Sequence, residues 1–388
     1  MQNARHGGRE RLIMIYLDNC ATTRTDREVA EYAMDVMLNH FGNPSSLHFA
    51  GSDAYGLLQD ARSKVSRMIS AQNNCIYFTS GGTEGNNLAI QGAAFANWER
   101  GRHIITTDIE HSSVLDCCKY LETQGFEVTY VKPDPHTHTM RAEDILNAVR
   151  PDTILISMML VNNETGEILP LKEVVEKVRE NRPDILIHTD LVQAFGKVPF
   201  KLYECGVDLA TASSHKIHGT KGMGMLYIRT GCKVRPFKYG GSQEGKINPG
   251  TENVPLACAF GLATDKLIGT IRENYQKVEE LKAYLLERVQ AAFPNVHINS
   301  GEGYSPYVVN FSLPGYSSGD IVDYCSFRDI YISAGSACSR GVKSHALQMY
   351  GFSDELVSSA LRIGLDVENT REELDTLIDT LLSFVHDR

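Results

Sequence analysis

Between residues 75 and 228, short apolar segments alternate with helical segments, and this alternation constrains the fold more than any other feature of the chain. The apolar segments are continuous rather than mixed with polar residues, which indicates strands that are buried on both faces. Strands that alternate with helices form a mainly parallel sheet with helices on both sides. We therefore predict an α/β fold with helices near 112–124, 142–150 and 171–181 and strands near 75–79, 103–106, 127–131, 153–159, 185–188, 207–212 and 225–228.

Polar clusters follow these strands at their carboxyl ends, where sheets of this kind bind their ligands. Ser80-Gly81-Gly82-Thr83 stands between a strand and a helix, so its free backbone N–H groups could bind a phosphate. A tight turn capped by Thr83 is the structural alternative. Because several such clusters follow successive strands, we expect one shared site, made by residues 80–87, 110–113, 161–166, Asp190 with Gln193, and 213–216.

Lys216 is the residue in these clusters whose chemistry is most specific. It follows a buried strand and stands among small residues and histidines. A lysine near other cations or in apolar surroundings loses its proton readily and becomes a nucleophile that forms Schiff bases. We hypothesise that Lys216 carries pyridoxal phosphate (PLP); a surface lysine in a glycine-rich turn is the alternative.

Composition excludes several classes of protein. The net charge of −10 argues against nonspecific nucleic-acid binding. The chain has no apolar run of about 18 residues, so we predict no membrane span. The nine cysteines are irregularly spaced and include no Cys-x-x-Cys pair, which favours a reducing cytoplasm over a disulfide framework or a zinc site. His136 and His138 lie in a proline-containing loop that we expect to be solvated, so we predict no metal site.

The 388 residues are enough for more than one domain. We predict a disordered tail over 1–13, a large domain over 14–255 whose first segment can pack on the second domain, and a smaller C-terminal α/β domain over 256–388. A long helical region from Pro255 to about Gln290 would connect them. Strands are expected near 308–313, 330–333 and 360–364, and Thr370 to Glu373 is a capping box for the last helix.

From Tyr16 onward, these motifs resemble the cysteine desulfurases, the NifS/IscS-like branch of the class V aminotransferase family of PLP enzymes. The resemblance implies a fold-type I PLP-dependent transferase with a mainly parallel, seven-stranded sheet. The motifs that carry it stand in the family's order: Tyr16-Leu17-Asp18-Asn19, Gly42-Asn43-Pro44-Ser45, Phe78 to Glu84, Glu110-His111, Val161-Asn162-Asn163-Glu164, His188-Thr189-Asp190, Ser213 to Gly222, and Ser333 to Cys338.

The resemblance also implies a role for each cluster. Lys216 would hold PLP as an aldimine, Asp190 would pair with the ring nitrogen, and His111 would stack on the ring and move protons. Gln193 and Asn163 would lie at the phenolic edge of the ring. The phosphate would be bound by Gly82, Thr83, Ser213, His215 and, from a second subunit, Thr251.

Arg362 and Cys338 define the reaction that the resemblance implies. Arg362 would bind the substrate carboxylate, with Asn163 nearby. Cys338 lies in a segment rich in glycine and serine, where a thiol can act as a nucleophile. The expected activity is conversion of L-cysteine to L-alanine, with the sulfur left as a persulfide on Cys338 for transfer to an acceptor protein.

Three alternatives stay open at this point. A class V aminotransferase and a selenocysteine lyase would use the same cofactor groups, and a PLP-binding scaffold without turnover would need neither Lys216 nor Asp190. The acceptor could be an iron–sulfur scaffold or a thiolation enzyme for tRNA or cofactors, since residues 339–345 differ from the segment expected in scaffold-serving members. We expect a cytoplasmic homodimer that binds neither membranes nor nucleic acid directly.

Overall fold

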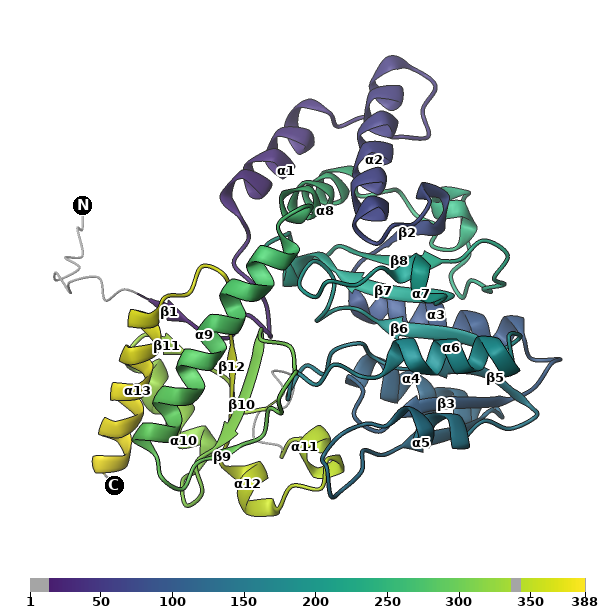
Figure 1. Cartoon of the computed structure of the whole chain (residues 1–388). Helices are drawn as coiled ribbons and strands as arrows, with labels where there is room; N and C mark the ends of the chain where they lie inside the picture. Colours follow the sequence, from purple (N-terminus) through teal and green to yellow (C-terminus); the bar gives the residue numbers. More distant parts are fainter. Residues whose placement is uncertain (1–13, 336–342, 388) are drawn as a thin grey trace, which may run out of the picture.

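The computed structural model describes residues 14–335 and 343–387 and has a seven-stranded sheet at its centre (Figure 1). All strands of this sheet are parallel except β8, which is antiparallel to both of its neighbours. The prediction of a mainly parallel, seven-stranded sheet is confirmed. In spatial order, the strands are β2 (Ile76–Thr79), β8 (Gly224–Ile228), β7 (Leu209–Ser213), β6 (Leu186–Asp190), β5 (Thr153–Ser157), β3 (His103–Thr107) and β4 (Glu127–Val131).

Helices cover both faces of the sheet because neighbouring strand residues are buried on opposite sides. Ile104 packs in one core cluster with α3 (Gly82–Ala96) and α4 (Ser112–Thr123). Ile105 packs in the other cluster. That second face is covered by α5 (Ala142–Asn147), α6 (Leu171–Asn181), α7 (Leu202–Cys205) and α8 (Val254–Leu267).

The chain before the sheet forms two helices, α1 (Arg27–Asn39) and α2 (Phe49–Met68), which pack on α8 at one end of the molecule (Figure 1). The Asp26 side chain caps α1 by accepting a hydrogen bond from the Val29 N–H. α2 begins at Phe49, and the His48 side chain before it accepts a hydrogen bond from the Gly51 N–H. These two helices therefore extend the core cluster that contains Ile105, which we call the first core, beyond the sheet.

The connecting region is two helices rather than one. α8 and α9 (Ile271–Ala292) are bent by 75° at a break that contains Gly269, whose φ of +92° is a conformation that glycine adopts easily. α8 lies in the first core, whereas α9 packs in a second core against α13 (Arg371–His386). We propose that the domain boundary lies at this break rather than at residue 255.

The second core surrounds a three-stranded antiparallel sheet. Thr370 and Glu373 form the predicted capping box of α13. A separate parallel pair joins the start of the chain to this part of the protein, because β1 (Ile15–Tyr16) pairs with β11 (Ile330–Tyr331). The sheet contains β9 (His297–Ile298), β10 (Val308–Ser312) and β12 (Ala360–Gly364), and the remaining helices are α10 (Ser318–Ser326), α11 (His345–Met349) and α12 (Asp354–Ser358).

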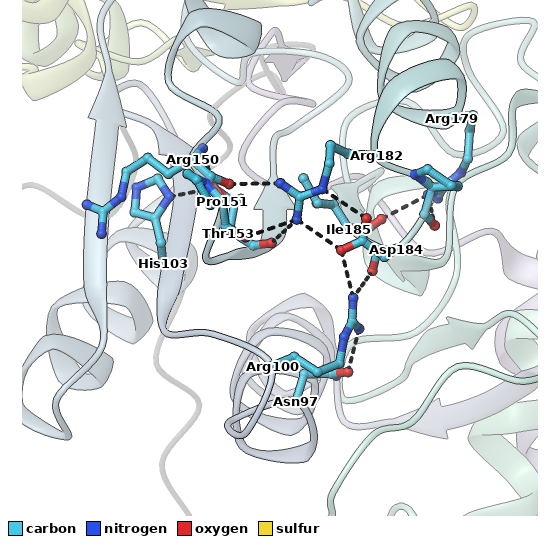
Figure 2. A network of polar contacts seen from close by, with 11 residues as sticks. Asn97, Arg100, His103, Arg150, Pro151, Thr153, Arg179, Arg182, Asp184 and Ile185 are labelled. Carbon is cyan, nitrogen blue, oxygen red and sulfur yellow. Dashed lines mark hydrogen bonds and ion pairs between the residues drawn. The ribbon is translucent and has the colours of Figure 1, made fainter.

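Arginines form a polar network at the end of the large sheet where β5 and β6 begin (Figure 2). Arg182 donates hydrogen bonds to the backbone oxygens of Arg150 and Thr153, at 2.9 and 3.4 Å, and binds the Asp184 carboxylate with two nitrogens. Arg100 reaches the same segment and donates to the Asp184 carbonyl at 2.6 Å. These contacts stabilise the beginnings of β5 and β6. The carboxyl ends of the strands, at the opposite end of the sheet, remain available for ligand binding.

Among the described residues, no single helix has the length and apolar content needed to cross a membrane. α8 and α9 reach that length and apolar content only as a pair, and the pair is bent at its break.

Candidate active site

A cavity of about 260 Å³ opens at the carboxyl ends of β5, β6 and β7. It brings together predicted residues from segments far apart in the chain, from the large sheet to Arg362 in β12 of the three-stranded sheet. Every predicted site residue except Thr251 and Cys338 lines it: Gly82, Thr83, His111, Asn163, Asp190, Gln193, Ser213, His215, Lys216 and Arg362.

Lys216 points toward the beginning of the chain. It lies in a short 3₁₀ turn after β7, and its Nζ donates hydrogen bonds to the carbonyl oxygens of Cys20 and Ala21, at 2.5 and 2.8 Å. Burial, together with the positive charges of Lys197 and Arg362, lowers the pKa of Lys216 to about 8. A far larger share of this amine than of an ordinary lysine is therefore neutral near physiological pH, as nucleophilic attack on an aldehyde requires.

Asp190 is buried at the carboxyl end of β6 with both oxygens engaged. Its Oδ1 accepts from the Val192 N–H at 2.8 Å, and its Oδ2 accepts from the Asn86 side-chain amide at 2.7 Å. These bonds fix the direction of the carboxylate in the cavity. A cationic or protonated ring nitrogen would complement it.

His111 precedes α4 and acts as its N-cap. The His111 Nδ1 accepts from the Ser113 N–H at 3.1 Å and lies 2.9 Å from the Ser113 Oγ. Burial lowers the pKa of His111, Asp190 opposes that change, and Lys216 adds to it. Burial therefore favours the neutral imidazole, which lines the cavity.

The turn before α3 suits a phosphate group. Gly81 has a φ of +152°, and a Cβ at Gly82 would lie 2.8 Å from the Val192 side chain, so the backbone approaches the cavity as only glycine permits. The amino terminus of α3 offers free N–H groups to an anion. Ser213 and His215 line the same cavity, and burial lowers the pKa of His215 to about 4.

Arg362 lies in the middle of β12 with its guanidinium fully buried. Its Nη2 is 3.1 Å from the Asp18 Oδ1, and its Nη1 donates to the Asn163 carbonyl at 3.1 Å. Its Nε has no hydrogen-bond partner among the described residues. A buried guanidinium with a free donor, next to a cavity, favours binding of a carboxylate.

Gln193 is held between the cavity and the start of the chain. Its Nε2 donates to the Cys20 carbonyl at 2.9 Å, and its buried Oε1 has no partner among the described residues. A polar atom without a partner at a cavity wall is available to a ligand group that can donate a hydrogen bond.

Two predicted residues do not join the cavity. Thr251 lines a separate cavity of about 230 Å³ with Glu84 and Glu244, so within one chain it does not contribute to the Lys216 site. Cys338 lies outside the described residues. The residues that flank its segment, Gly335 and Ser344, both lie against Glu164.

Sequence reasoning missed four contributors. Asn86 and Ser113 line the cavity and contact Asp190 and His111; both belong to the predicted polar clusters, but the sequence assigns neither a role. The other two are the carbonyls of Cys20 and Ala21, which accept from Lys216. A backbone carbonyl carries no side-chain pattern that a sequence could reveal.

The cavity suits a planar, phosphorylated aldehyde. A lysine amine with a lowered pKa, a fixed carboxylate and a glycine-lined helix terminus lie around one space that is large enough for a small cofactor. Together with Arg362, these groups can bind an amino acid next to such a cofactor.

Comparison with known proteins agrees with this chemistry. Residues 15–377 match the family described as aminotransferase class V. A cysteine desulfurase IscS of Methanosarcina thermophila is 40% identical over 374 residues, which are 96% of this chain and 92% of the relative. A second IscS, from Dictyoglomus turgidum, is 39% identical over 370 residues, or 95% of this chain and 93% of the relative. Among solved structures, a NifS-like protein has a TM-score of 0.91 at 34% identity and covers 97% of this chain and 100% of its own.

Proposed function

Because the chain belongs to the class V aminotransferase family and is a cysteine desulfurase, we propose that it binds PLP on Lys216 and transfers sulfur from L-cysteine to Cys338. The observation that carries this proposal is the presence of Lys216, Asp190 and Arg362 around one cavity of about 260 Å³. These groups supply an amine for the cofactor aldehyde, a carboxylate for its ring nitrogen and a cation for the substrate carboxylate.

The residues that would hold PLP fit its chemistry. Members of this family are PLP enzymes, and bound PLP supplies an electron sink for the α-carbon of an amino acid. Asp190 would pair with the ring nitrogen, Gln193 and Asn163 would face the phenolic edge, and His111 would lie against the ring. The phosphate would be bound at the start of α3 by Gly82 and Thr83, with Ser213 and His215 opposite.

Arg362 and Lys216 would orient and activate the substrate. The Arg362 guanidinium would hold the carboxylate of L-cysteine, which sets the direction of the α-carbon. The Lys216 Nζ would accept the α-proton of the substrate, and the two carbonyls that it contacts would keep it at the cavity wall. A pKa of about 8 suits a group that both accepts and returns a proton.

The sulfur step would take place on Cys338. Its thiolate attacks the substrate sulfur, an S–S bond forms and the Cβ–S bond breaks. The electron pair of that bond and a proton end on Cβ. One L-cysteine and one thiol thus give one L-alanine and one persulfide, with no external oxidant or reductant.

We further propose a homodimer that forms through α1 and α2. Large apolar side chains of this region are 56–101% exposed. An apolar area of this kind is typical of an interface. In a dimer the exposed segment that carries Thr251 could reach the partner's phosphate. We call this area the α1–α2 patch: Met34, Met37, Leu38, Phe41, Leu47 and Phe49.

The persulfide acceptor would be an iron–sulfur scaffold or an enzyme that thiolates tRNA or a cofactor. A cytoplasmic location is supported by the cysteines, because those among the described residues are all free.

The test is turnover of L-cysteine with a thiol reductant, recorded with the absorbance spectrum. We expect wild type to be yellow and to release alanine and sulfide, and Cys338→Ala to stay yellow and release neither. Cys205→Ala, a half-buried cysteine outside the cavity, is the matched control. Alanine release by Cys338→Ala equal to that of wild type would instead favour a selenocysteine lyase, whereas an aminotransferase would release no alanine from L-cysteine.

A further inference from the structure

A buried row of hydrogen bonds joins Asp190 to His111 through two residues with no assigned role. The Asn86 Nδ2 lies 2.7 Å from the Asp190 Oδ2 and 2.9 Å from the Ser113 Oγ. The Ser113 Oγ lies 2.9 Å from the His111 Nδ1. The four residues come from β6, α3, and α4 with the N-cap residue before it, so the row crosses three elements beside one cavity.

The direction of each bond follows from the chemistry of the groups. An ionised Asp190 can only accept, so Asn86 must present its amide NH₂ and not its oxygen. One N–H of that group goes to Asp190 and the other to the Ser113 Oγ. Since the Ser113 oxygen accepts there, its own hydrogen is free to point to the His111 Nδ1.

The His111 Nδ1 therefore accepts from both the hydroxyl and the backbone N–H of Ser113, at 2.9 and 3.1 Å. A nitrogen that accepts two hydrogen bonds carries no proton in a neutral imidazole. The proton of neutral His111 must then sit on Nε2.

We propose that Asn86 and Ser113 are positioning residues that hold His111 in the Nε2–H tautomer and keep the Asp190 carboxylate turned toward the cavity. This inference rests on the proposed function, in which both groups contact the same cofactor ring. In this arrangement the tautomer of the His111 imidazole depends on the Asp190 carboxylate through Asn86 and Ser113.

The burial of Asn86 supports a role beyond packing. Asn86 is fully buried, and its Oδ1 has no hydrogen-bond partner among the described residues. A buried polar atom without a partner is unfavourable, so an apolar side chain would serve better if the site only had to be filled. The Asn86 amide offsets this cost because both hydrogens of its NH₂ group form hydrogen bonds, one to Asp190 and one to Ser113.

The charged groups around His111 are few. Asp190 from β6 favours the imidazolium, Lys216 after β7 disfavours it, and Asp116 on α4 favours it weakly. Loss of the Ser113 hydroxyl removes a donor that stabilises the neutral ring, so the pKa of His111 should rise. The acidic limb of an activity profile that needs neutral His111 should then move to higher pH.

The test compares Asn86→Ala, Ser113→Ala, the double variant and Ser113→Thr as PLP-loaded enzymes. We expect the acidic limb of kcat/KM to move up by about 0.5–1 pH unit in Ser113→Ala, which is a 3- to 10-fold loss below the limb. Ser113→Thr keeps the hydroxyl and should restore the profile. Asn86→Ala should also raise the Kd for PLP by about 10- to 100-fold, because a buried bond to a charged group is lost. Gln91→Ala, an amide on the same helix outside the cavity, is the control.

Two readouts separate this role from a merely structural one. In ¹⁵N-histidine spectra, with the His111 peak assigned by its loss in His111→Gln, wild type should show an unprotonated Nδ1 and the variants a mixture of tautomers. The double variant should shift the pH profile no further than Ser113→Ala alone, because that substitution already removes the hydroxyl that donates to the His111 Nδ1. A protonated Nδ1 in wild type, or additive effects in the double variant, would overturn the proposal. Failure of the proposed function would look different, since wild type itself would then lack PLP or turnover.

Discussion

Asp18 and Arg362 form an ion pair across 344 residues of sequence, with 3.1 Å between Oδ1 and Nη2. The Arg362 side chain is 2% exposed and that of Asp18 is 20% exposed, so the pair is largely out of water. A carboxylate of the protein thus already balances the guanidinium that we propose for the substrate carboxylate. Substrate binding by Arg362 and the folding stability of the protein should therefore both depend on this ion pair.

Asp18→Ala should lower the free energy of unfolding by about 2–3 kcal/mol, somewhat less than for a fully buried pair, because it leaves Arg362 without its carboxylate. L-alanine supplies a replacement carboxylate without reacting further. It should therefore raise the thermal midpoint of the variant more than that of wild type. Equal shifts in the two proteins, measured by calorimetry with and without L-alanine, would contradict a shared role for Arg362.

The reaction of the apoenzyme with PLP should depend on pH through Lys216. Its pKa of about 8 means that the neutral amine, and with it the rate of PLP binding, rises about tenfold per pH unit up to pH 8 and then levels off. Lys197 is one of the cations that lower this pKa, so Lys197→Met should move the inflection to higher pH. Stopped-flow absorbance measures the rate, and Lys201→Met, an exposed lysine nearby, should leave the inflection where it is.

The segment that carries Thr251 depends on one buried ion pair. Glu244, Gly245 and Lys246 all have positive φ, at 45°, 58° and 67°, which is unfavourable for the two non-glycine residues. Arg62 holds Glu244 with two bonds of 2.8 and 2.7 Å, and the Phe78 N–H donates to the same carboxylate at 2.7 Å.

Glu244→Gln should therefore cost about 3–5 kcal/mol of stability, as expected when one partner of a buried pair is removed. It should also speed proteolysis within residues 238–253. Asp265→Asn breaks the exposed pair with Arg67 and should cost about 1 kcal/mol or less, which makes it the matched control in denaturant unfolding. A cost for Glu244→Gln no larger than that of the control would show that the backbone does not rely on the pair.

The α1–α2 patch predicts the oligomeric state. Met37→Glu with Phe41→Glu places two charges on this exposed apolar surface and should convert a dimer into a monomer, as measured by analytical ultracentrifugation. The monomer should bind PLP more weakly, because Thr251 of a second subunit is lost. A monomeric wild type, or a variant that stays dimeric, would show that the patch is not the interface.

Much of the large sheet could be predicted from sequence because its strands are buried on both faces. β3, β5, β7 and β8 are buried at every position, so their sequences are rich in apolar and small residues and easily recognised as strands. Lys216 and Asp190 could be predicted for the same reason, since they follow such runs. The topology of a parallel sheet then brings these residues together without further information.

The remaining features depend on contacts that leave little trace in the sequence. The carbonyls of Cys20 and Ala21 act through the backbone. Asn86 and Ser113 gain their role only when α3 and α4 meet beside β6. The break at Gly269 was overlooked because the flanking segments are both good helices, and one glycine in such a region is tolerated.

The pairing of β1 with β11 sets an order of events during synthesis. Asp18 leaves the ribosome 344 residues before its partner Arg362, an interval on the order of tens of seconds at ordinary rates of translation. Cys20 and Ala21, which accept from Lys216, belong to the same early segment and dock where the late strands β11 and β12 lie. The nascent chain therefore cannot complete its lysine site until translation is almost finished.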